Sequence, residues 1–293
     1  MSRAAVVGAV NMDICGKPFS PLLMRDSNPG TITLSPGGVG RNIAHDLRLL
    51  GLDVTFVTAL GDDGYAGEIL KSCSALGFDM SLARHMPGGR TSSYMYITDP
   101  SGDMALAVCD TDVADSLSPE YLAGCMDSLN SADAVVLDGN LTEESIRFTA
   151  GSCTAPVYAD PVSVTKAGRM KGILSLLAAF KPNEIEATNL TGLQDPEDAA
   201  KALVDAGVGR VFVSLGAGGV IAADGHQLLR VPCEPASIVN TTGAGDAATS
   251  AIVWAGINGL GLEDTALAAM RAGALAISCP GTNNPEMTAD RLR

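Results

Sequence analysis

The sequence predicts an α/β protein whose central, mostly parallel sheet carries helices on both faces. Two observations predict it. Short apolar runs of strand length alternate with longer segments of helical periodicity along the 293 residues, as in a three-layer α/β/α core. Hydrophobic residues make up 46% of the chain, which is enough for a large core. The length by itself allows one or two domains.

Each element follows from its local pattern. Strands are expected at 5–10, 54–59, 134–137, 157–159 and 211–215, and helices at 42–50, 65–76, 119–129, 143–151 and 196–206. In the first helix Ile43, Leu47 and Leu50 share one face, and Gly51 suits its end. Two apolar stretches, 247–257 and 262–278, are expected to be helices near the C-terminus. In such folds ligands bind at the carboxyl ends of the strands.

Two stretches depart from this alternation. Residues 14–36 contain Gly, Pro and Ser with a β-prone run at 31–34, and residues 90–109 alternate up to Ile97, turn at 99–102 and return from Met104. We expect them to form a small separate sheet that acts as a lid over the ligand. Its exposed edges would pair with a second subunit, giving a homodimer through the lid. The alternative is a pair of ordinary surface hairpins.

Composition excludes several classes of partner. The formal net charge is −14 and aromatic residues make up 4%, which argues against nucleic acid and against an anionic membrane surface. No apolar run approaches the roughly 18–20 residues of a membrane span, and the start reads as a first strand rather than a signal peptide. The seven scattered cysteines form no C-x-x-C pair, as expected for free thiols in a reducing cytoplasm.

The run 240–247 places a glycine-rich turn directly ahead of the helix expected at 247–257. The backbone N–H groups of such a turn, with the positive end of the helix dipole, form a site for an anion. Asp246 lies at the lip of this site, where a carboxylate can take the proton of an attacking hydroxyl. Phosphoryl transfer to an alcohol needs both parts. A plain tight turn remains the alternative, because Gly243 and Gly245 also fit a loose dinucleotide-binding pattern.

Two segments suit a polyhydroxylated ligand. Gly37 and Gly38 precede the helix at 42–50 and would let the backbone approach a sugar, for which Asn42 offers a donor and an acceptor. Asn11 and Asp13 follow the first strand, where Asp13 could accept two hydrogen bonds from a vicinal diol. A bare turn and a capping residue are the respective alternatives.

Two other segments suit a metal and a nucleotide. Asn183 and Glu186 are three residues apart at a helix start, and could hold the water shell of Mg²⁺ or form a capping box. The run from Ser214 to Gly219 ends a strand and could contact nucleotide phosphates or form a hairpin turn. The chain lacks G-x-x-x-x-G-K-[ST] and is therefore not a P-loop enzyme.

With both glycine motifs present, the chain resembles the ribokinase-like carbohydrate kinases, the PfkB family, over nearly its whole length. The two family signatures correspond to residues 37–44 and 242–247, with N-x-x-E between them at 183–186. Within the family the chain is most similar to the pseudouridine kinases. The strings that carry this closer resemblance are 26–30, 37–44, 91–94, 160–163, 181–183, 240–247 and 282–285.

The resemblance implies one ribokinase-like kinase domain over residues 1–293, with a lid from about 14–36 and 90–109. The implied reaction is ATP-dependent phosphorylation of the pseudouridine 5′-hydroxyl, with Asp246 as general base and the N–H groups of Gly243, Ala244 and Gly245 as anion hole. Asn183 and Glu186 would organise Mg²⁺ through water. The nucleoside would be held by Asn11, Asp13, Gly37, Gly38, Asn42, Ser93 and Tyr94, and ATP by Asn183, Ser214, Gly216, Gly218, Thr242, Gly243, Gly245 and Asn283.

Two matters stay open at this level. Many members have Asp where Asn240 stands, near a monovalent-cation site, so the need for K⁺ is not decided. The acceptor could also be another nucleoside or sugar, such as uridine, inosine or ribose. The chain could also be a nucleoside-binding protein without catalysis, although the intact Asp246 and glycine turn argue against this function.

Overall fold

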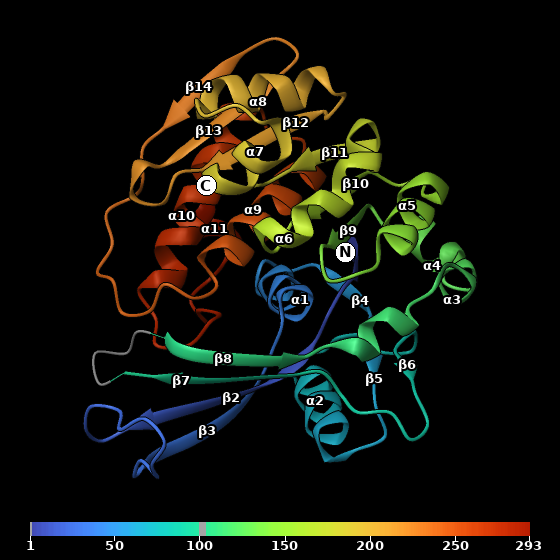
Figure 1. The fold of residues 1–293 in the computed structure, drawn as a ribbon. Coiled ribbons are helices and arrows are strands. Elements are labelled where there is room, and N and C mark those ends of the chain that lie inside the picture. The colour runs from blue at the N-terminus through green and yellow to red at the C-terminus, as the bar shows by residue number, and fades with distance from the viewer. Residues whose placement is uncertain (1, 100–103) are drawn as a thin grey trace.

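The computed structural model describes residues 2–99 and 104–293, so most of the hairpin turn expected at 99–102 lies outside the described residues. An eight-stranded sheet forms the centre of the molecule (Figure 1). The strands from β12 to β4 run parallel, and β13 and β14 are added antiparallel at one edge. In sheet order they are β14 (Leu228–Val231), β13 (Val220–Asp224), β12 (Arg210–Ser214), β11 (Leu177–Phe180), β10 (Val157–Asp160), β9 (Ala134–Asp138), β1 (Arg3–Val7) and β4 (Asp53–Val57).

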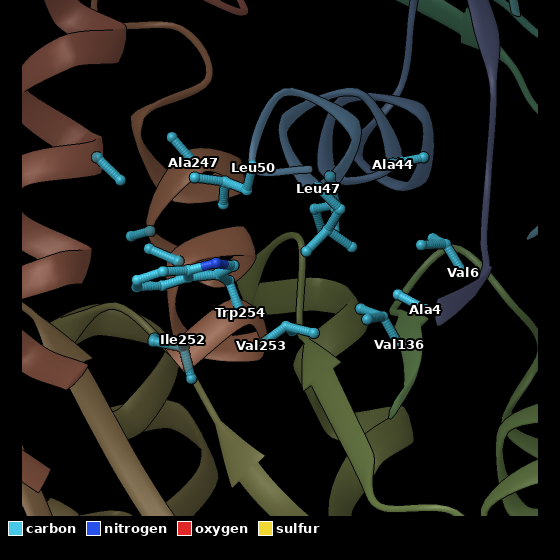
Figure 2. Close-up of a cluster of buried hydrophobic side chains, with 14 of the residues drawn as sticks. Ala4, Val6, Ala44, Leu47, Leu50, Val136, Ala247, Ile252, Val253 and Trp254 are labelled. Atoms are coloured by element: carbon cyan, nitrogen blue, oxygen red, sulfur yellow. The ribbon is translucent and has the colours of Figure 1, made fainter. Parts of the chain in front are cut away.

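One face of this sheet packs against a layer of apolar helices. Trp254 and Val253 belong to the same buried cluster as Leu47, Val6 and Val136 (Figure 2). This cluster joins the sheet to the helices that carry the two glycine motifs. The helices on this side are α1 (Val39–Leu49), α2 (Gly64–Ala75), α9 (Ala244–Ile257), α10 (Leu262–Ile277) and α11 (Ala289–Leu292).

The opposite face has its own core. Val135 and Leu137 of β9 point into it, whereas Val136 points the other way, because successive side chains of a strand alternate between faces. Burial on both faces explains why these strands read as continuous apolar runs. The elements on this side are α3 (Pro119–Ala123), α4 (Met126–Asn130), α5 (Glu143–Ser152), η2 (Gly168–Leu176), α7 (Glu184–Thr191) and α8 (Pro196–Asp205). The expected three-layer α/β/α arrangement is confirmed.

Four of the strands outside the central sheet form the expected small sheet, below the core in Figure 1. Its order is β3 (Gly30–Gly37), β2 (Asn11–Pro18), β7 (Ser93–Thr98) and β8 (Met104–Asp110). Tyr94 pairs with Asp13 across β2 and β7, and Met95 pairs with Ile14. One face of the sheet therefore carries Asp13 and Tyr94, and the other carries Ile14 and Met95. We call these the polar face and the apolar face.

The structure departs from the sequence prediction in two respects. The helix expected at 119–129 is two short helices, α3 and α4, separated at Gly124 and Cys125, because glycine is a poor helix former. The strands β11, β13 and β14 were not predicted. The remaining short elements are β5 (Ala59–Leu60), β6 (Arg84–His85), η1 (Asp112–Ser116), α6 (Val164–Ala167) and η3 (Gly216–Gly218).

Two predictions from composition can be compared with the structure. All seven cysteines are free thiols. Within the described residues, none of the helices combines the length and the apolar character that crossing a bilayer requires.

Candidate functional site

Charged and polar side chains gather where the parallel strands end. Asp138 and Asp160 are the last residues of β9 and β10, Lys181 comes directly after β11, and Ser214 ends β12. These residues are far apart in the chain, but parallel strands bring their carboxyl ends to one edge of the sheet. This is the edge at which α/β folds bind ligands.

The glycine turn ahead of α9 has the geometry of an anion site. Gly243 has φ 87° and precedes the first residue of the helix, Ala244. A side chain at Gly243 would overlap the carbonyl oxygen of Thr282, so glycine is required here by both conformation and space. The first backbone N–H groups of a helix have no partner within it and can hold an anion.

Asn240 shapes the turn from the other side. Its Oδ1 accepts a hydrogen bond from the Thr242 backbone N–H at 3.0 Å, and its Nδ2 donates to the Pro280 carbonyl at 3.2 Å. Both ends of the amide therefore connect the turn to neighbouring backbone. The side chain that stands in place of an Asp is thus engaged in hydrogen bonds of its own.

The two glycine motifs meet at Asp246. Nδ2 of Asn42, in α1, donates to Oδ2 of Asp246, in the first turn of α9, at 2.9 Å. The other end of the same amide is oriented by Arg41, whose Nη1 donates to Oδ1 of Asn42 at 3.4 Å. Arg41 and Asn42 are both buried. The amide of Asn42 is therefore fixed with its donor towards the carboxylate of Asp246.

The surroundings of Asp246 favour its protonated form at neutral pH. Burial of the carboxyl raises its pKa to about 8, and the neighbouring carboxylates of Asp160 and Asp46 act in the same direction. The hydrogen bond from Asn42 and the charge of Lys181 oppose the shift. A base with a pKa near the working pH takes up and releases a proton most effectively, and such shifted groups gather at functional sites.

Four candidate nucleoside-binding residues lie together at the start of the small sheet. Asn11 pairs with Gly37 between β2 and β3, and the Asn11 amide donates to Oδ1 of Asp13. A side chain at Gly37 would overlap the Asp13 carboxylate, and one at Gly38 would crowd Oδ1 of Asn11. Burial raises the pKa of Asp13 to about 6, against the hydrogen bond from Asn11 and the charge of Arg41.

The structure separates the two candidates of β7. Tyr94 shares the polar face with Asp13, and its ring centroid lies 5.6 Å from that of Tyr96. Ser93 pairs with Met12 and so belongs to the other face of the sheet. Tyr96, which sequence reasoning did not single out, lies on the polar face instead; the alternation that points to Tyr94 would also have found it.

A cleft of ≈ 470 Å³ lies beside the glycine turn ahead of α9, which we call the anion turn. Three of the candidate nucleotide-binding residues line it: Ser214, Gly216 and Gly245. Asn183 is next to them, because it forms an isolated bridge with Ser214. The other residues that line the cleft are Ala217, Gly219, Cys233, Glu234, Pro235, Ala236, Ile238, Thr241, Ala244, Ala248 and the α10 residues Met270, Gly273, Ala274 and Ile277.

The remaining residues predicted to bind the nucleotide do not line this cleft. Gly218 lies in η3, within the turn that joins the antiparallel strands β12 and β13, so the hairpin alternative is realised there. Thr242 and Gly243 belong to the turn itself. Asn283 directs its amide to α1, donating to the Asn42 carbonyl at 3.0 Å and to Oδ1 of Asp46 at 2.9 Å. These contacts give Asn283 a role in holding α1.

Asn183 and Glu186 form the capping box of α7. Oδ1 of Asn183 accepts from the Glu186 N–H, and Oε2 of Glu186 accepts from the Asn183 N–H, both at 2.8 Å. The box uses one of the two carboxylate oxygens of Glu186. Across the described residues, no group of three or more His, Cys, Asp or Glu side chains is arranged to hold a metal.

A buried lysine is the main residue that sequence reasoning missed. Burial would lower the pKa of Lys181, but the charges of Asp160, Glu186 and Asp246 outweigh it and raise the pKa. Nζ of Lys181 is 3.4 Å from Oδ2 of Asp160. The signal was present in the sequence: a charged residue directly after an apolar run.

Comparisons with known proteins agree with this architecture. The family profile described as pfkB family carbohydrate kinase matches residues 1–289. The pseudouridine kinase of Escherichia coli (strain K12) is 33% identical over 291 residues, covering 97% of this chain and 93% of that protein. An uncharacterized sugar kinase of the same strain is 36% identical over 295 residues, covering 97% of this chain and 81% of its own length.

A solved structure has the same fold. It is an E. coli protein described as a candidate ribokinase II, in complex with ATP and Mg²⁺. Its TM-score is 0.86 at 18% identity, covering 100% of this chain and 98% of that chain. At this identity the likeness shows the ribokinase-like fold.

Proposed function

The chain belongs to the pfkB family of carbohydrate kinases, and from this premise we propose that it transfers the γ-phosphoryl group of ATP to the 5′-hydroxyl of pseudouridine. The acceptor hydroxyl gives its proton to Asp246 while its oxygen bonds to the γ-phosphorus. The bond from that phosphorus to the bridging oxygen breaks, and ADP leaves. A phosphotransferase with an alcohol acceptor follows from the family; the nucleoside and the residue roles are the proposal.

One observation carries the chemistry: Asp246 lies in the first turn of α9, directly after the Gly243–Gly245 turn, and accepts a hydrogen bond from Asn42. The carboxylate is thus next to the place where a transferring phosphoryl group would be held. Positioning and charge stabilisation supply most of the catalysis in phosphoryl transfer. The adjacent cleft, lined by Ser214, Gly216 and Gly245, is where the nucleotide would bind.

Two further features support a nucleoside acceptor. The polar face of the small sheet carries Asp13, which suits a ribosyl diol, and the neighbouring rings of Tyr94 and Tyr96 suit a planar base. The 33% identity to a pseudouridine kinase across nearly the full length favours pseudouridine among the nucleosides. In this proposal residues 1–293 form one kinase domain and the small sheet is its lid.

We propose Mg²⁺ as the metal, organised through water by Glu186 and Asn183 beside the phosphates of ATP. The capping box leaves one Glu186 carboxylate oxygen for this task. The carboxyl groups of Asp160 and Glu186, whose charges act on Lys181, support a divalent cation at the same edge of the sheet. Because Asn240 already bridges the turn and the Pro280 carbonyl, K⁺ is tested rather than assumed.

The apolar face of the small sheet supports a homodimer. Leu34, Met95 and Val108 lie in one row across the sheet and are exposed, as are Ile32 and Leu106 in the next row. Contiguous exposed apolar surface of this kind marks an interaction site. In the proposed dimer two copies of the small sheet bury these faces against each other.

The proposal is tested by ADP release from Mg·ATP with pseudouridine, uridine, inosine and ribose in parallel, each with and without K⁺. Preference for pseudouridine by orders of magnitude in kcat/KM is the expected result. Faster turnover of another acceptor would keep the kinase chemistry and reject the proposed nucleoside. Binding of pseudouridine without any ADP release would reject the enzyme in favour of a silent binding protein.

A further inference from the structure

The anion turn has a charged side chain directly behind it. Nζ of Lys181 would lie 3.4 Å from a Cβ built on Gly245, closer than any other described atom outside the neighbouring backbone of α9. Lys181 is buried, and Gly245 also lines the cleft beside the turn, in which we propose that the nucleotide binds. The ammonium group is therefore separated from the cleft by little more than the backbone of the turn.

Other elements hold the ammonium group in place. Oδ2 of Asp160 lies 3.4 Å from Nζ and also accepts a hydrogen bond from the hydroxyl of Thr249, in α9, at 2.6 Å. The Val162 backbone N–H donates to Oδ1 of Asp160 at 2.9 Å, and Val162 has φ 67°, which is costly for a β-branched residue. Asp160 thus connects β10, Lys181 and the base-bearing helix.

We propose that Lys181 is a positioning residue of the phosphoryl-transfer site: held by Asp160, it places one full positive charge behind the Gly243–Gly245 turn and reinforces the backbone N–H groups there. The inference rests on the proposed function and names the residue that supplies a full positive charge to its site. The ligand it acts on is the phosphate chain of the nucleotide, above all the γ-phosphoryl group as it moves towards the acceptor.

The charge balance of the site favours a fixed positive charge next to the phosphates. The charges of Asp160 and Glu186 act on the lysine, and a polyphosphate brought to this edge adds negative charge to theirs. Backbone N–H groups contribute only partial charges. Charge that is fixed in place, away from bulk water, acts strongly on the transition state because it needs no rearrangement during the reaction.

The competing explanation is that Lys181 only neutralises Asp160 for stability. The two explanations differ in the double variant. Lys181→Met removes the charge and leaves Asp160 unpaired, whereas Asp160→Asn with Lys181→Met removes both charges and restores a neutral pair. If stability were the whole role, the double variant would regain activity. In our proposal it stays as slow as Lys181→Met, because the charge behind the turn is still missing.

The experiment measures kcat, both KM values and the melting temperature, with whichever acceptor of the panel the wild-type enzyme phosphorylates. We expect Lys181→Met to lower kcat by about 10²-fold, as for the loss of one donor at an oxyanion site. The nucleoside KM should change by less than about threefold, and affinity for ADP should fall while affinity for adenosine does not. Lys181→Arg should restore part of kcat.

The controls separate the possible failures. Lys201→Met removes an exposed lysine from α8 and should leave kcat unchanged. If Lys181→Met does not fold, the kcat of the neutral double variant still tests the proposal. Recovery of kcat in the double variant, or a folded Lys181→Met with wild-type kcat, overturns the proposal. If the wild-type enzyme prefers another acceptor, the proposed nucleoside is wrong, but the proposed role of Lys181 is unaffected.

Discussion

The side-chain amide of Asn42 donates a hydrogen bond of 2.9 Å to the carboxylate of Asp246. Asn42 lies near the start of α1 and Asp246 near the start of α9, at opposite ends of the chain. The two helices pack over the same face of the sheet, through Leu47 and Val253 among others (Figure 2). One contact thus joins the residue expected to bind the sugar to the residue expected to take its proton.

This contact predicts a pH effect for Asn42→Ala. The hydrogen bond lowers the pKa of Asp246, so its loss raises that pKa further. Asp246 acts as a base only when ionised, so the acid limb of kcat/KM should move to higher pH, and the nucleoside KM should also rise. The measurement is kcat/KM from pH 6 to 10. Asn258→Ala, at the other end of α9, is the matched control. An unmoved acid limb in Asn42→Ala would contradict the prediction.

Asp246→Ala should lower kcat by about 10²–10⁴-fold, the usual contribution of a positioned general base. Nucleoside binding should survive, because in the proposed function Asn11, Asp13 and Asn42 hold the sugar. Steady-state kinetics and calorimetric titration with the nucleoside test the two parts. Asp264→Ala removes an exposed carboxylate from the first turn of α10 and should change neither. A matching loss of binding in Asp246→Ala would show that the residue holds the substrate instead.

The buried carboxyl of Asp46 predicts a pH-dependent stability. Burial raises its pKa to about 7, so the folded chain keeps a proton that the unfolded chain releases near its ordinary pKa. This contribution is complete below about pH 4 and is lost as the pH rises through about 7. Asp13, Asp138 and Asp246, whose pKa values are also raised, act in the same direction.

The melting temperature should therefore fall as the pH rises from about 5 to about 8. Asp46→Asn keeps an oxygen for the Asn283 amide and removes the titrating group, so it should flatten this fall and melt above the wild type at pH 8. Calorimetric scans across the range test it, with the exposed Asp205→Asn as control. A variant with the slope of the wild type would show that other groups are responsible.

A single substitution at Glu186 can separate its structural role in the capping box from its proposed role in binding Mg²⁺. Glu186→Gln keeps an oxygen for the capping box but removes the charge, so we expect little loss of stability and a higher Mg²⁺ concentration for half-maximal activity. Asp195 caps the next helix through the Glu197 and Asp198 N–H groups. Asp195→Asn should therefore leave the Mg²⁺ dependence unchanged. An unchanged Mg²⁺ dependence in Glu186→Gln would leave Glu186 with its structural role alone.

The apolar face of the small sheet predicts the oligomeric state. Light scattering after gel filtration should give twice the chain mass for the wild type and the chain mass for Leu34→Lys with Met95→Lys, because a buried charge without a partner is costly. Leu176→Lys, on η2 of the core, is the control at another exposed leucine. A monomeric wild type would reject the dimer and leave the kinase chemistry unaffected.

Sequence by itself determined the class of fold and most of the chemical groups. Strand-length apolar runs between helical patterns predict a parallel sheet because only buried strands need both faces apolar. The turn at 240–247 and the carboxylate of Asp246 are local features, so they could be read locally. The alternation in 91–97 predicted a strand of the small sheet, although Ser93 lies on the face opposite Tyr94.

Tertiary structure alone decided which of these groups meet. Lys181, Asp160 and Asp246 come from three different elements, and no local pattern encodes their proximity. Parallel strands place their carboxyl ends at one edge, and the packing of α1 and α9 brings Asn42 to Asp246. Charges acquire shifted pKa values only when packing removes their water and sets them beside one another. That is why Asp246 could be proposed as the base from the sequence, whereas the hydrogen bond from Asn42 and the position of Lys181 behind the turn could not be predicted.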